Sequence, residues 1–287
     1  MKPDRADYYS DSHPNDLPQA PDCTVTQPVH LYSAQDHATW KALYERQTQL
    51  LQGRVCDEFL QGLNQLQMSA ERVPDFNDLN AVLQSTTGWQ IVAVNGLVPD
   101  HVFFEHLANR RFPCTWWMRR PEQMDYLQEP DCFHDVFGHV PLLINPIFAD
   151  YMQAYGEGGM KAQSLQVLPM LARLYWYTVE FGLIQTERGL RIYGAGIVSS
   201  KAESVYSLES ELPNRIGFDL QRILRTEYKI DDMQKTYFVI NCFTQLFQET
   251  RADFTQIYEQ LKHLPSFSAT EVLPYDQLIA RTESPTP

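Results

Sequence analysis

Two histidines lie five residues apart in the segment CFHDVFGHV, residues 132–140. His134 and His139 flank Asp135, and imidazole and carboxylate groups are common ligands of transition metals. On a regular α-helix of about 100° per residue, side chains five positions apart point roughly 140° away from each other. Gly138 therefore predicts that a short helix ends before His139, so that both rings can turn toward one point. The alternative is two unrelated histidines, one packed and one exposed.

A single acid in an apolar segment strengthens the metal hypothesis. Glu180 lies in RLYWYTVEFGL, where its neighbours are aromatic or aliphatic. A carboxylate in such a segment is costly unless it is paired, hydrogen-bonded or bound to a metal. Arg173 is a possible structural partner, but it lies seven positions earlier, at the limit of reach. Two histidines and one carboxylate can hold one face of a metal ion and leave its other positions open for small molecules.

These residues alone do not distinguish an iron site from a zinc site, because zinc peptidases also use two histidines and a glutamate. In those enzymes a glutamate base lies between helical histidines, whereas here the intervening acid is Asp135 in a different register. A zinc hydrolase also needs a positioned base and an oxyanion donor, and the sequence offers no convincing set. A helical domain without enzymatic activity would leave Glu180 and the histidines unexplained.

The composition narrows the class of protein. The chain has 287 residues, 44% apolar and 21% charged, which is ordinary for a soluble globular protein. Its net charge of −13 argues against nucleic acid and anionic membrane surfaces as partners. We expect no membrane span and no signal peptide, since the long apolar runs of both are lacking. The five scattered cysteines contain no CxxC pair and predict reduced thiols in the cytoplasm.

Helical periodicity dominates the chain and predicts a mainly α fold with a few short β-strands. Ser33 and Asp36 resemble a capping box at the start of the first helix, although Asp replaces the usual Glu or Gln. The predicted helices include residues 33–51, 55–66, 74–84, 146–159, 168–183, 218–226 and 237–248, with a short one from residue 99. The predicted strands, which are short and β-branched or aromatic, are residues 89–94, 112–118 and a segment within 188–196.

Three segments resemble one enzyme family. PDCFHDVFGHVPLL, YWYTVEFGL and YGAGIVSS are similar to the catalytic core of the pterin-dependent aromatic amino acid hydroxylases, and most similar to the short bacterial phenylalanine 4-hydroxylases. The resemblance extends from about Ser33 through at least Phe247. It implies a non-haem Fe(II) held by His134, His139 and Glu180. A tetrahydropterin and O2 would meet at the open face of the iron, and L-phenylalanine would be hydroxylated to L-tyrosine.

The resemblance also implies a substrate pocket. Arg119 matches an arginine that holds the substrate carboxylate, and a guanidinium can grip a carboxylate through two parallel bonds. Without the resemblance it is a surface arginine beside Arg120. Ser199 matches a serine near the same carboxylate and is otherwise a loop serine. Pro130 and Trp176 match the walls of the aromatic pocket, although a tryptophan in a buried helix more often belongs to the core.

For the pterin, Phe103 matches the aromatic ring that stacks on the cofactor. Gly96 and Val98 match a loop whose backbone pairs with the pterin ring. Asp135 occupies a place where some relatives carry glutamate, and this shorter acid can contact the pterin through a water. The rivals within the family are tyrosine and tryptophan hydroxylases; Trp176 disfavours the tryptophan enzyme, and LQEP at residues 127–130 follows the bacterial phenylalanine pattern.

The expected organisation is a single catalytic domain, residues 33–265. An irregular N-terminal arm, residues 1–32, would precede it, and a C-terminal segment, residues 266–287, would end in the flexible tail TESPTP. No heptad pattern that predicts a tetramerisation helix follows Pro265. We therefore expect a monomer, or at most a weak dimer, with only small-molecule partners.

Overall fold

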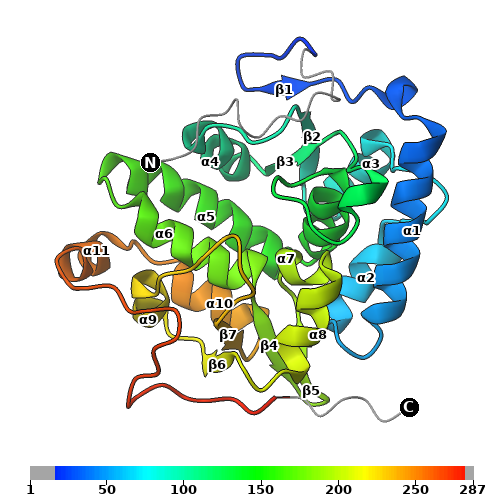
Figure 1. Ribbon diagram of the computed structural model, residues 1–287. Helices are drawn as coiled ribbons and strands as arrows, with labels where there is room; N and C mark the ends of the chain where they lie inside the picture. Colours follow the sequence, from blue (N-terminus) through cyan, green and yellow to red (C-terminus); the bar gives the residue numbers. More distant parts are fainter. Residues whose placement is uncertain (1–16, 282–287) are drawn as a thin grey trace.

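The computed structural model describes residues 17–281 and shows a mainly α chain with two small β-sheets (Figure 1), which confirms the predicted fold class. The first part of the predicted arm, 1–16, and the predicted flexible tail, 282–287, lie outside the described residues. The α-helices are α1 (Ala34–Leu50), α2 (Asp57–Gln65), α3 (Phe76–Thr86), α4 (Asp100–Ala108), α5 (Pro146–Ser164), α6 (Leu168–Tyr175), α7 (Ala195–Val198), α8 (Lys201–Glu209), α9 (Leu220–Arg225), α10 (Phe243–Thr250) and α11 (Thr255–Leu261).

Short 3₁₀- and π-helical turns and seven strands complete the described chain. The 3₁₀-helices are η2 (Val29–Leu31), η3 (Pro121–Gln123) and η5 (Val140–Ile144), and the π-helices are η4 (Phe133–His139) and η6 (Trp176–Glu180). The strands are β1 (Thr24–Val25), β2 (Gln90–Val94), β3 (Arg111–Thr115), β4 (Leu183–Thr186), β5 (Gly189–Ile192), β6 (Asn214–Gly217) and β7 (Thr236–Ile240). No helix within residues 17–281 has the length and apolar character needed to span a membrane.

The first helix begins at the capping residue that the sequence predicted. Ser33 Oγ accepts a bond from the Asp36 N–H at 3.2 Å, and the Ser33 N–H donates to the Asp36 carboxylate at 2.8 Å. The capping box is therefore present despite the shorter acid. The Asp75 side chain caps α3 by accepting from the Asn77 N–H at 2.9 Å. Because α1 contacts η4, the cap that fixes the start of α1 also helps to position the segment that carries the two histidines.

The three-stranded sheet, ordered β1-β2-β3, places two loops side by side. β2 and β3 run parallel, with Val94 opposite Thr115, so both strands end at the same edge. The segment containing Gly96 and Val98 leaves this edge from β2, and the segment leading to Arg119 leaves it from β3. The sheet therefore brings residues assigned to the pterin and to the substrate toward one region.

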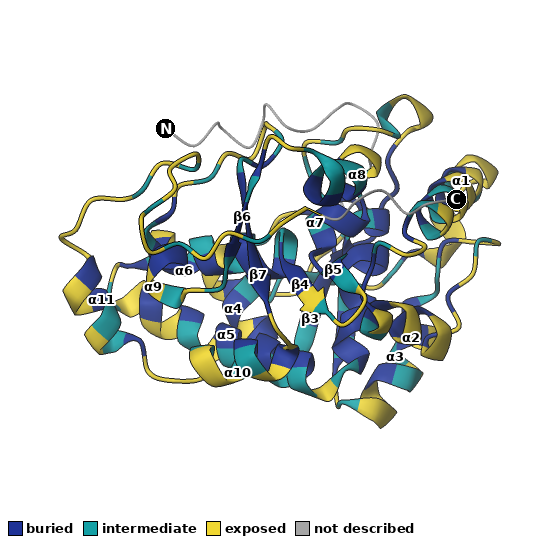
Figure 2. Cartoon of the chain, turned by 90° about the horizontal axis from the view of Figure 1, so that it is seen from below, coloured by how far each residue is buried: buried dark blue, intermediate teal, exposed yellow. Residues whose placement is uncertain are grey.

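The four-stranded sheet, ordered β5-β4-β7-β6, lies near the bottom of Figure 1, and its inner strand β7 is buried (Figure 2). All five residues of β7 are buried, and β7 pairs in parallel with both β4 and β6. The prediction of a helix over residues 237–248 was wrong in its first half: β7 ends at Ile240, and only α10, which begins at Phe243, is helical. A short, fully buried apolar run has no periodicity that separates a central strand from a helix.

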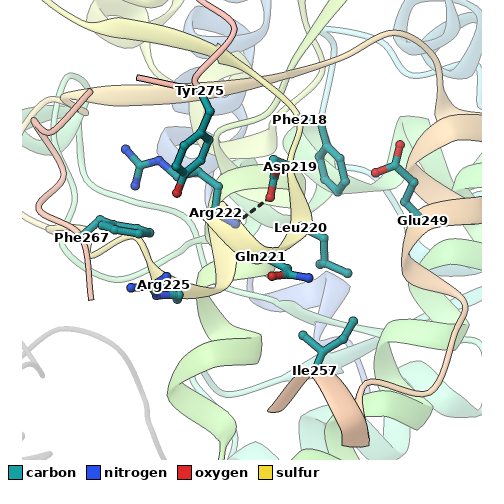
Figure 3. Close-up of a pocket in the computed structure, with 10 residues that line it drawn as sticks. All are labelled: Phe218, Asp219, Leu220, Gln221, Arg222, Arg225, Glu249, Ile257, Phe267 and Tyr275. Carbon is teal, nitrogen blue, oxygen red and sulfur yellow. Dashed lines mark hydrogen bonds between the residues drawn. The ribbon is translucent and has the colours of Figure 1, made fainter. Parts of the chain in front are cut away.

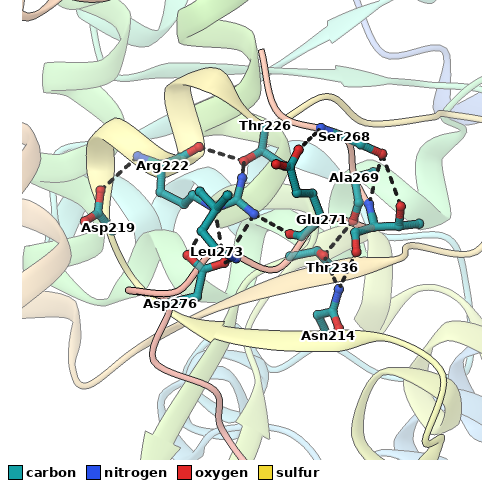
Figure 4. A network of polar contacts seen from close by, with 11 residues as sticks. Asn214, Asp219, Arg222, Thr226, Thr236, Ser268, Ala269, Glu271, Leu273 and Asp276 are labelled. Atoms are coloured by element: carbon teal, nitrogen blue, oxygen red, sulfur yellow. Dashed lines mark hydrogen bonds and ion pairs between the residues drawn. The ribbon is translucent and has the colours of Figure 1, made fainter. Parts of the chain in front are cut away.

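The segment after α11 runs across the domain and is held by a buried arginine (Figure 4). Arg222 Nε donates to Asp276 at 3.1 Å, and its Nη1 donates to Thr226 Oγ1 at 2.8 Å. The Gly217 N–H also donates to the Gln277 carbonyl at 2.8 Å. Burial of both charges in this ion pair is compensated because each has hydrogen-bonding partners. Residues 266–279 are thus tied to β6 and α9.

Candidate metal centre and active site

The two histidines lie on one short π-helix, η4, which continues through Gly138 to His139. The prediction that a helix ends at Gly138 was therefore wrong. Backbone hydrogen bonds of a π-helix join residues five apart, so the wider turn places side chains at positions i and i+5 on one side. This turn brings the Nε2 atoms of His134 and His139 within 3.4 Å of each other. The five-residue spacing that is awkward for an α-helix suits a π-helix.

Glu180 is the last residue of the second π-helix, η6, which continues α6. Its Oε1 lies 3.3 Å from His139 Nε2, and its Oε2 lies 3.6 Å from His134 Nε2. Arg173, the alternative partner considered from the sequence, instead donates to the Leu224 carbonyl at 2.9 Å. The Glu180 carboxylate therefore faces the two imidazole rings.

The three groups have the spacing that a metal ion requires. Ligand atoms that bind one ion at about 2.1 Å and at roughly right angles lie about 3 Å from one another, close to the separations found here. Burial lowers the pKa of His134 to about 4, so its ring is neutral at pH 7 and can offer a nitrogen lone pair. Burial opposes ionisation of Glu180, but the two histidines and the Gly196 N–H outweigh it and lower its pKa. The donor set thus fits a divalent ion.

Asp135 is a competing acid, because one of its oxygens lies within 4.8 Å of nitrogens of both His134 and His139. Its Oδ2, however, accepts a bond from the buried Thr115 N–H at 2.7 Å. Burial raises the pKa of Asp135 to about 7, so its charged form is disfavoured, whereas the pKa of Glu180 is lowered. The geometry therefore favours Glu180 as the third ligand, with Asp135 beside the site.

The YGAG segment brings a loop against the backbone of Glu180. A Cβ atom at Gly194 would collide with the Glu180 carbonyl and lie 2.5 Å from the Gly182 nitrogen. At Gly196 a Cβ would lie 2.8 Å from the Phe181 ring. Only glycine permits this approach, which carries the chain directly to α7 and Ser199.

The Ser199 hydroxyl contacts His134, a metal-ligand candidate, rather than Arg119. Its Oγ is 2.9 Å from Nδ1 of His134 and donates its only proton to the Ala195 carbonyl at 2.8 Å. Nδ1 of His134 must therefore be the donor in its contact with Ser199. This contact leaves Nε2 unprotonated and turned toward His139 and Glu180, as a metal ligand requires.

Arg119 is buried and already holds a carboxylate of the chain itself. Its Nε and Nη2 donate to the two Asp131 oxygens at 2.9 and 2.8 Å. Burial opposes the charges, but each partner stabilises the other, so the pKa of Asp131 is lowered and that of Arg119 is raised. The forked edge of the guanidinium is thus occupied, and only its remaining N–H groups are available to a substrate.

An aromatic group adjoins the histidines on the side of α4. Phe103 is half-buried, and its ring meets those of Tyr175 and Phe112 edge-on at centroid distances of 5.7 and 6.4 Å. Phe112 in turn lies 4.8 Å from the His139 ring. Phe103 is therefore within the same region as the metal-ligand candidates and has a partly exposed ring on which a flat heterocycle could stack.

The loop between β2 and α4 is fixed in shape by glycine and by two indoles. Gly96 has φ 149°, in a region that favours glycine. Trp117 Nε1 donates to the Asn95 carbonyl at 3.1 Å, and Trp116 Nε1 donates to the Asn95 side chain at 3.1 Å. Gly96 and the half-buried Val98 thus lie in a loop held against the end of β3.

Pro130 and Trp176 each precede a metal-ligand candidate by four positions, Pro130 before His134 and Trp176 before Glu180. Trp176 is half-buried, not a core residue, and lies at the start of η6, four positions before Glu180. Pro130 is also half-buried and directly precedes Asp131. Both are placed where partly exposed side chains can line a pocket.

A separate cavity of about 540 Å³ lies beside α9 (Figure 3). Arg222 and Arg225 line it, but Arg222 is paired with Asp276, and Arg225 donates to the Pro265 carbonyl at 2.7 Å. None of the residues predicted for the active site lines this cavity. It is therefore separate from the histidine–glutamate centre.

The sequence reasoning missed two residues that organise the site. Asp131 is wholly buried and joins Arg119 to η4, since it also accepts from the His134 N–H at 3.0 Å. Its only signal in the sequence was an acid three positions before His134. Tyr175 contacts both Phe103 and His139, but it is one of three consecutive aromatic residues in the run YWY and carried no distinguishing pattern.

Residues 24–282 match the biopterin-dependent aromatic amino acid hydroxylases. The chain belongs to this family. A family relative, the phenylalanine-4-hydroxylase of Ralstonia nicotianae, is 70% identical over 259 residues, which cover 90% of this chain and 83% of the relative. The resemblance of the three motifs to the pterin-dependent hydroxylases is thereby confirmed.

Two crystal structures of phenylalanine hydroxylase from Chromobacterium violaceum, a family member, have the same fold. The one with iron and phenylalanine bound has a TM-score of 0.88 and 62% identity, and the match covers 92% of this chain and 96% of that one. The other, with iron(III) and 7,8-dihydrobiopterin bound, has a TM-score of 0.89 and 63% identity, over 92% and 95% of the two chains.

Proposed function

We propose that the chain is a phenylalanine 4-monooxygenase, which hydroxylates L-phenylalanine to L-tyrosine with O2 and a tetrahydropterin at a non-haem Fe(II). The observation that carries this proposal is the convergence of His134, His139 and Glu180, whose donor atoms lie 3.3, 3.4 and 3.6 Å apart. The 70% identical phenylalanine-4-hydroxylase and the related structures with iron, phenylalanine and dihydrobiopterin support it.

In this proposal the three ligands hold one face of the iron and leave the opposite positions open. The iron and the reduced pterin, when bound, supply the activation of O2 that transfers one oxygen atom to the ring. Ser199 keeps His134 in the tautomer that binds metal, and the Gly196 N–H stabilises the Glu180 carboxylate. No residue is assigned as an acid or base acting on the substrate.

Arg119 would bind the substrate carboxylate through the N–H groups that Asp131 leaves available. Pro130 and Trp176 would form walls for the phenyl ring and orient its para carbon toward the metal. The Ser199 hydroxyl bonds to His134 and to the Ala195 carbonyl, so its contribution to substrate binding would be indirect.

The pterin would stack on Phe103 and pair with the backbone at Gly96 and Val98. The partly exposed ring of Phe103, its contact with Tyr175 and the rigid glycine loop support this placement. Asp135 would act beside the pterin. Because burial raises its pKa to about 7, it can offer either a donor or an acceptor to a bridging water.

The test is a product assay on chelator-treated protein with Fe(II) or Zn(II) restored separately. The proposal requires tyrosine from phenylalanine only when Fe(II), tetrahydropterin and O2 are all present. Parallel reactions with tyrosine and tryptophan measure the preference within the family. Iron-loaded protein that leaves phenylalanine unchanged would contradict the substrate assignment, and activity with zinc alone would contradict the metal.

We further propose that the chain is a cytoplasmic monomer with one catalytic domain, residues 33–265, against which β1 and residues 266–279 are packed. Free, buried thiols at Cys56, Cys114 and Cys132 suit a reducing compartment. From Lys262 to Arg281, the last described residue, the chain follows the domain surface and forms no helix that could assemble copies. Light scattering should give the monomer mass of 33.3 kDa.

A further inference from the structure

Trp176 is braced by a loop outside the helix that carries it. Its indole stacks on Tyr228 at a centroid distance of 4.4 Å and an interplanar angle of 14°. Its Nε1 donates to Gln234 Oε1 at 2.8 Å. Tyr228 and Gln234 both belong to the segment between α9 and β7. One loop therefore holds both a face and the polar edge of this indole.

Every polar atom of the Gln234 amide is engaged. While Oε1 accepts from Trp176, Nε2 donates to the carbonyls of Lys229 and Asp232 at 3.0 and 3.2 Å. An indole N–H only donates and a carbonyl only accepts, so these partners admit one orientation of the amide. Gln234 is 5% exposed, although Lys229 and Asp232 are exposed. Gln234 is thus the buried centre around which an exposed loop is folded.

Gln234 is itself anchored to the core. Its backbone N–H donates to Glu203 Oε1 at 3.2 Å, and the same carboxylate accepts from the Tyr237 hydroxyl. The loop also borders a cavity of about 340 Å³, which is lined by Tyr228 and Gln234 and by residues 268–270. A loop next to such a space can relax into it when its central bonds are removed, and Tyr228 would then leave the indole.

We infer that Gln234 is a positioning residue for phenylalanine hydroxylation. Its amide joins the Trp176 indole and the loop bearing Tyr228 into one rigid wall, which sets the angle at which the substrate ring meets the metal. This inference rests on the proposed function, in which Trp176 lines the ring pocket. Gln234 does not touch the reacting atoms; it acts through Trp176, four residues from Glu180.

The test is a double-mutant cycle on the iron-loaded full chain. Gln234→Met keeps the side-chain length but removes the bonds to the indole and the loop. Trp176→Phe keeps an aromatic wall but removes the indole N–H. We expect Gln234→Met to raise the phenylalanine KM about three- to tenfold, which corresponds to the net free energy of about one hydrogen bond. The amount of tyrosine formed per pterin oxidised should fall. The pterin KM and the iron content should not change.

In the Trp176→Phe background, Gln234→Met should raise the phenylalanine KM less than it does in the wild type, because the bond to the indole is already gone and only the bonds to the Lys229 and Asp232 carbonyls remain to be lost. Equal effects in both backgrounds would overturn the inference. Gln245→Met is the matched control, since the Gln245 amide joins Asn241 to Glu249 and not to Trp176.

Misfolding is separated from repositioning by a direct readout of the indole. With ¹⁵N-labelled tryptophan, the Trp176 indole signal is assigned by its loss in Trp176→Phe. In Gln234→Met it should shift upfield and exchange faster while the other indole signals stay in place; a shift of all of them would overturn the inference. If the wild-type chain forms no tyrosine, the proposed function fails and this inference with it. If the wild type forms tyrosine and Gln234→Met matches it, only the inference fails.

Discussion

Asp131 binds both nitrogens of the forked edge of Arg119, with Nε and Nη2 at 2.9 and 2.8 Å from its two oxygens. The carboxylate is wholly buried, and it also accepts from the His134 N–H at 3.0 Å. A single acid therefore connects the arginine proposed for the substrate to the helix proposed for the metal. Their relative positions depend on this ion pair.

Asp131→Asn should destabilise the protein by about 3 kcal/mol, because it leaves the buried Arg119 charge uncompensated. The phenylalanine KM should also rise, since the guanidinium loses its orientation. Urea unfolding of the metal-free protein measures the first effect. The control is Asp57→Asn, which breaks an exposed pair with Arg188 and should cost below about 1 kcal/mol. Similar losses in both variants would contradict the structural role of Asp131.

Removal of the third ligand distinguishes the two acids near the histidines. Glu180→Gln should lose stoichiometric iron, whereas Asp135→Asn should retain it. Because a ligand that binds only the folded state stabilises it, saturating Fe(II) should raise the Tm of the wild type and of Asp135→Asn by about 5 °C, and that of Glu180→Gln much less. Metal analysis and calorimetry measure these effects. The reverse pattern would make Asp135 the ligand.

Ser199→Ala should weaken Fe(II) binding by about 10- to 100-fold, because the His134 ring loses the partner that fixes its tautomer. Competition with a coloured chelator measures the affinity. Ser207→Ala is a matched control: the Ser207 hydroxyl is buried and has no hydrogen-bond partner among the described residues. It should leave the metal affinity unchanged. Equal affinities for all three proteins would show that Ser199 does not orient His134.

Gly194→Ala should destabilise the protein by several kcal/mol and reduce metal binding, because the new Cβ would collide with the Glu180 carbonyl. Gly158→Ala is the opposite case. Gly158 lies inside α5 with nothing within 4 Å of an added Cβ, so alanine should stabilise the helix by about 0.5–1 kcal/mol. Thermal unfolding compares the two variants. A stable Gly194→Ala protein with normal iron content would contradict the proposed close packing.

Glu203 gives a pH dependence of known sign. Burial raises its pKa above the ordinary value of 4.5 for a glutamate, although the Tyr237 and Gln234 hydrogen bonds oppose the shift. As the pH rises past about 4.5, the unfolded state ionises first, so wild-type stability falls until the folded-state group ionises as well. Glu203→Gln removes this loss. Its stability relative to wild type should grow with pH from about pH 4 upward and then level off; a difference that shrinks with pH would contradict the assignment.

The sequence correctly predicted the elements whose formation depends on local interactions. The Ser33 cap and the β2 strand follow from turn chemistry and side-chain type, and the structure confirms both. The polar residue in an apolar segment, Glu180, identified a site because an isolated buried charge is costly. The family motifs then indicated the reaction. Periodicity failed at β7, since a strand buried on both faces carries no alternating pattern.

The amino-acid sequence by itself determined which ligand types this protein carries and which family it belongs to. Only the tertiary structure decided how those ligands meet: two π-helical turns bring His134, His139 and Glu180 together, and no local propensity predicts such turns. The partners of Arg119 and Trp176, Asp131 and Gln234, were likewise decided by the fold. Partners as far apart in the chain as Trp176 and Gln234 have no sequence signature, because side chains pair by their position in space and not by spacing along the chain.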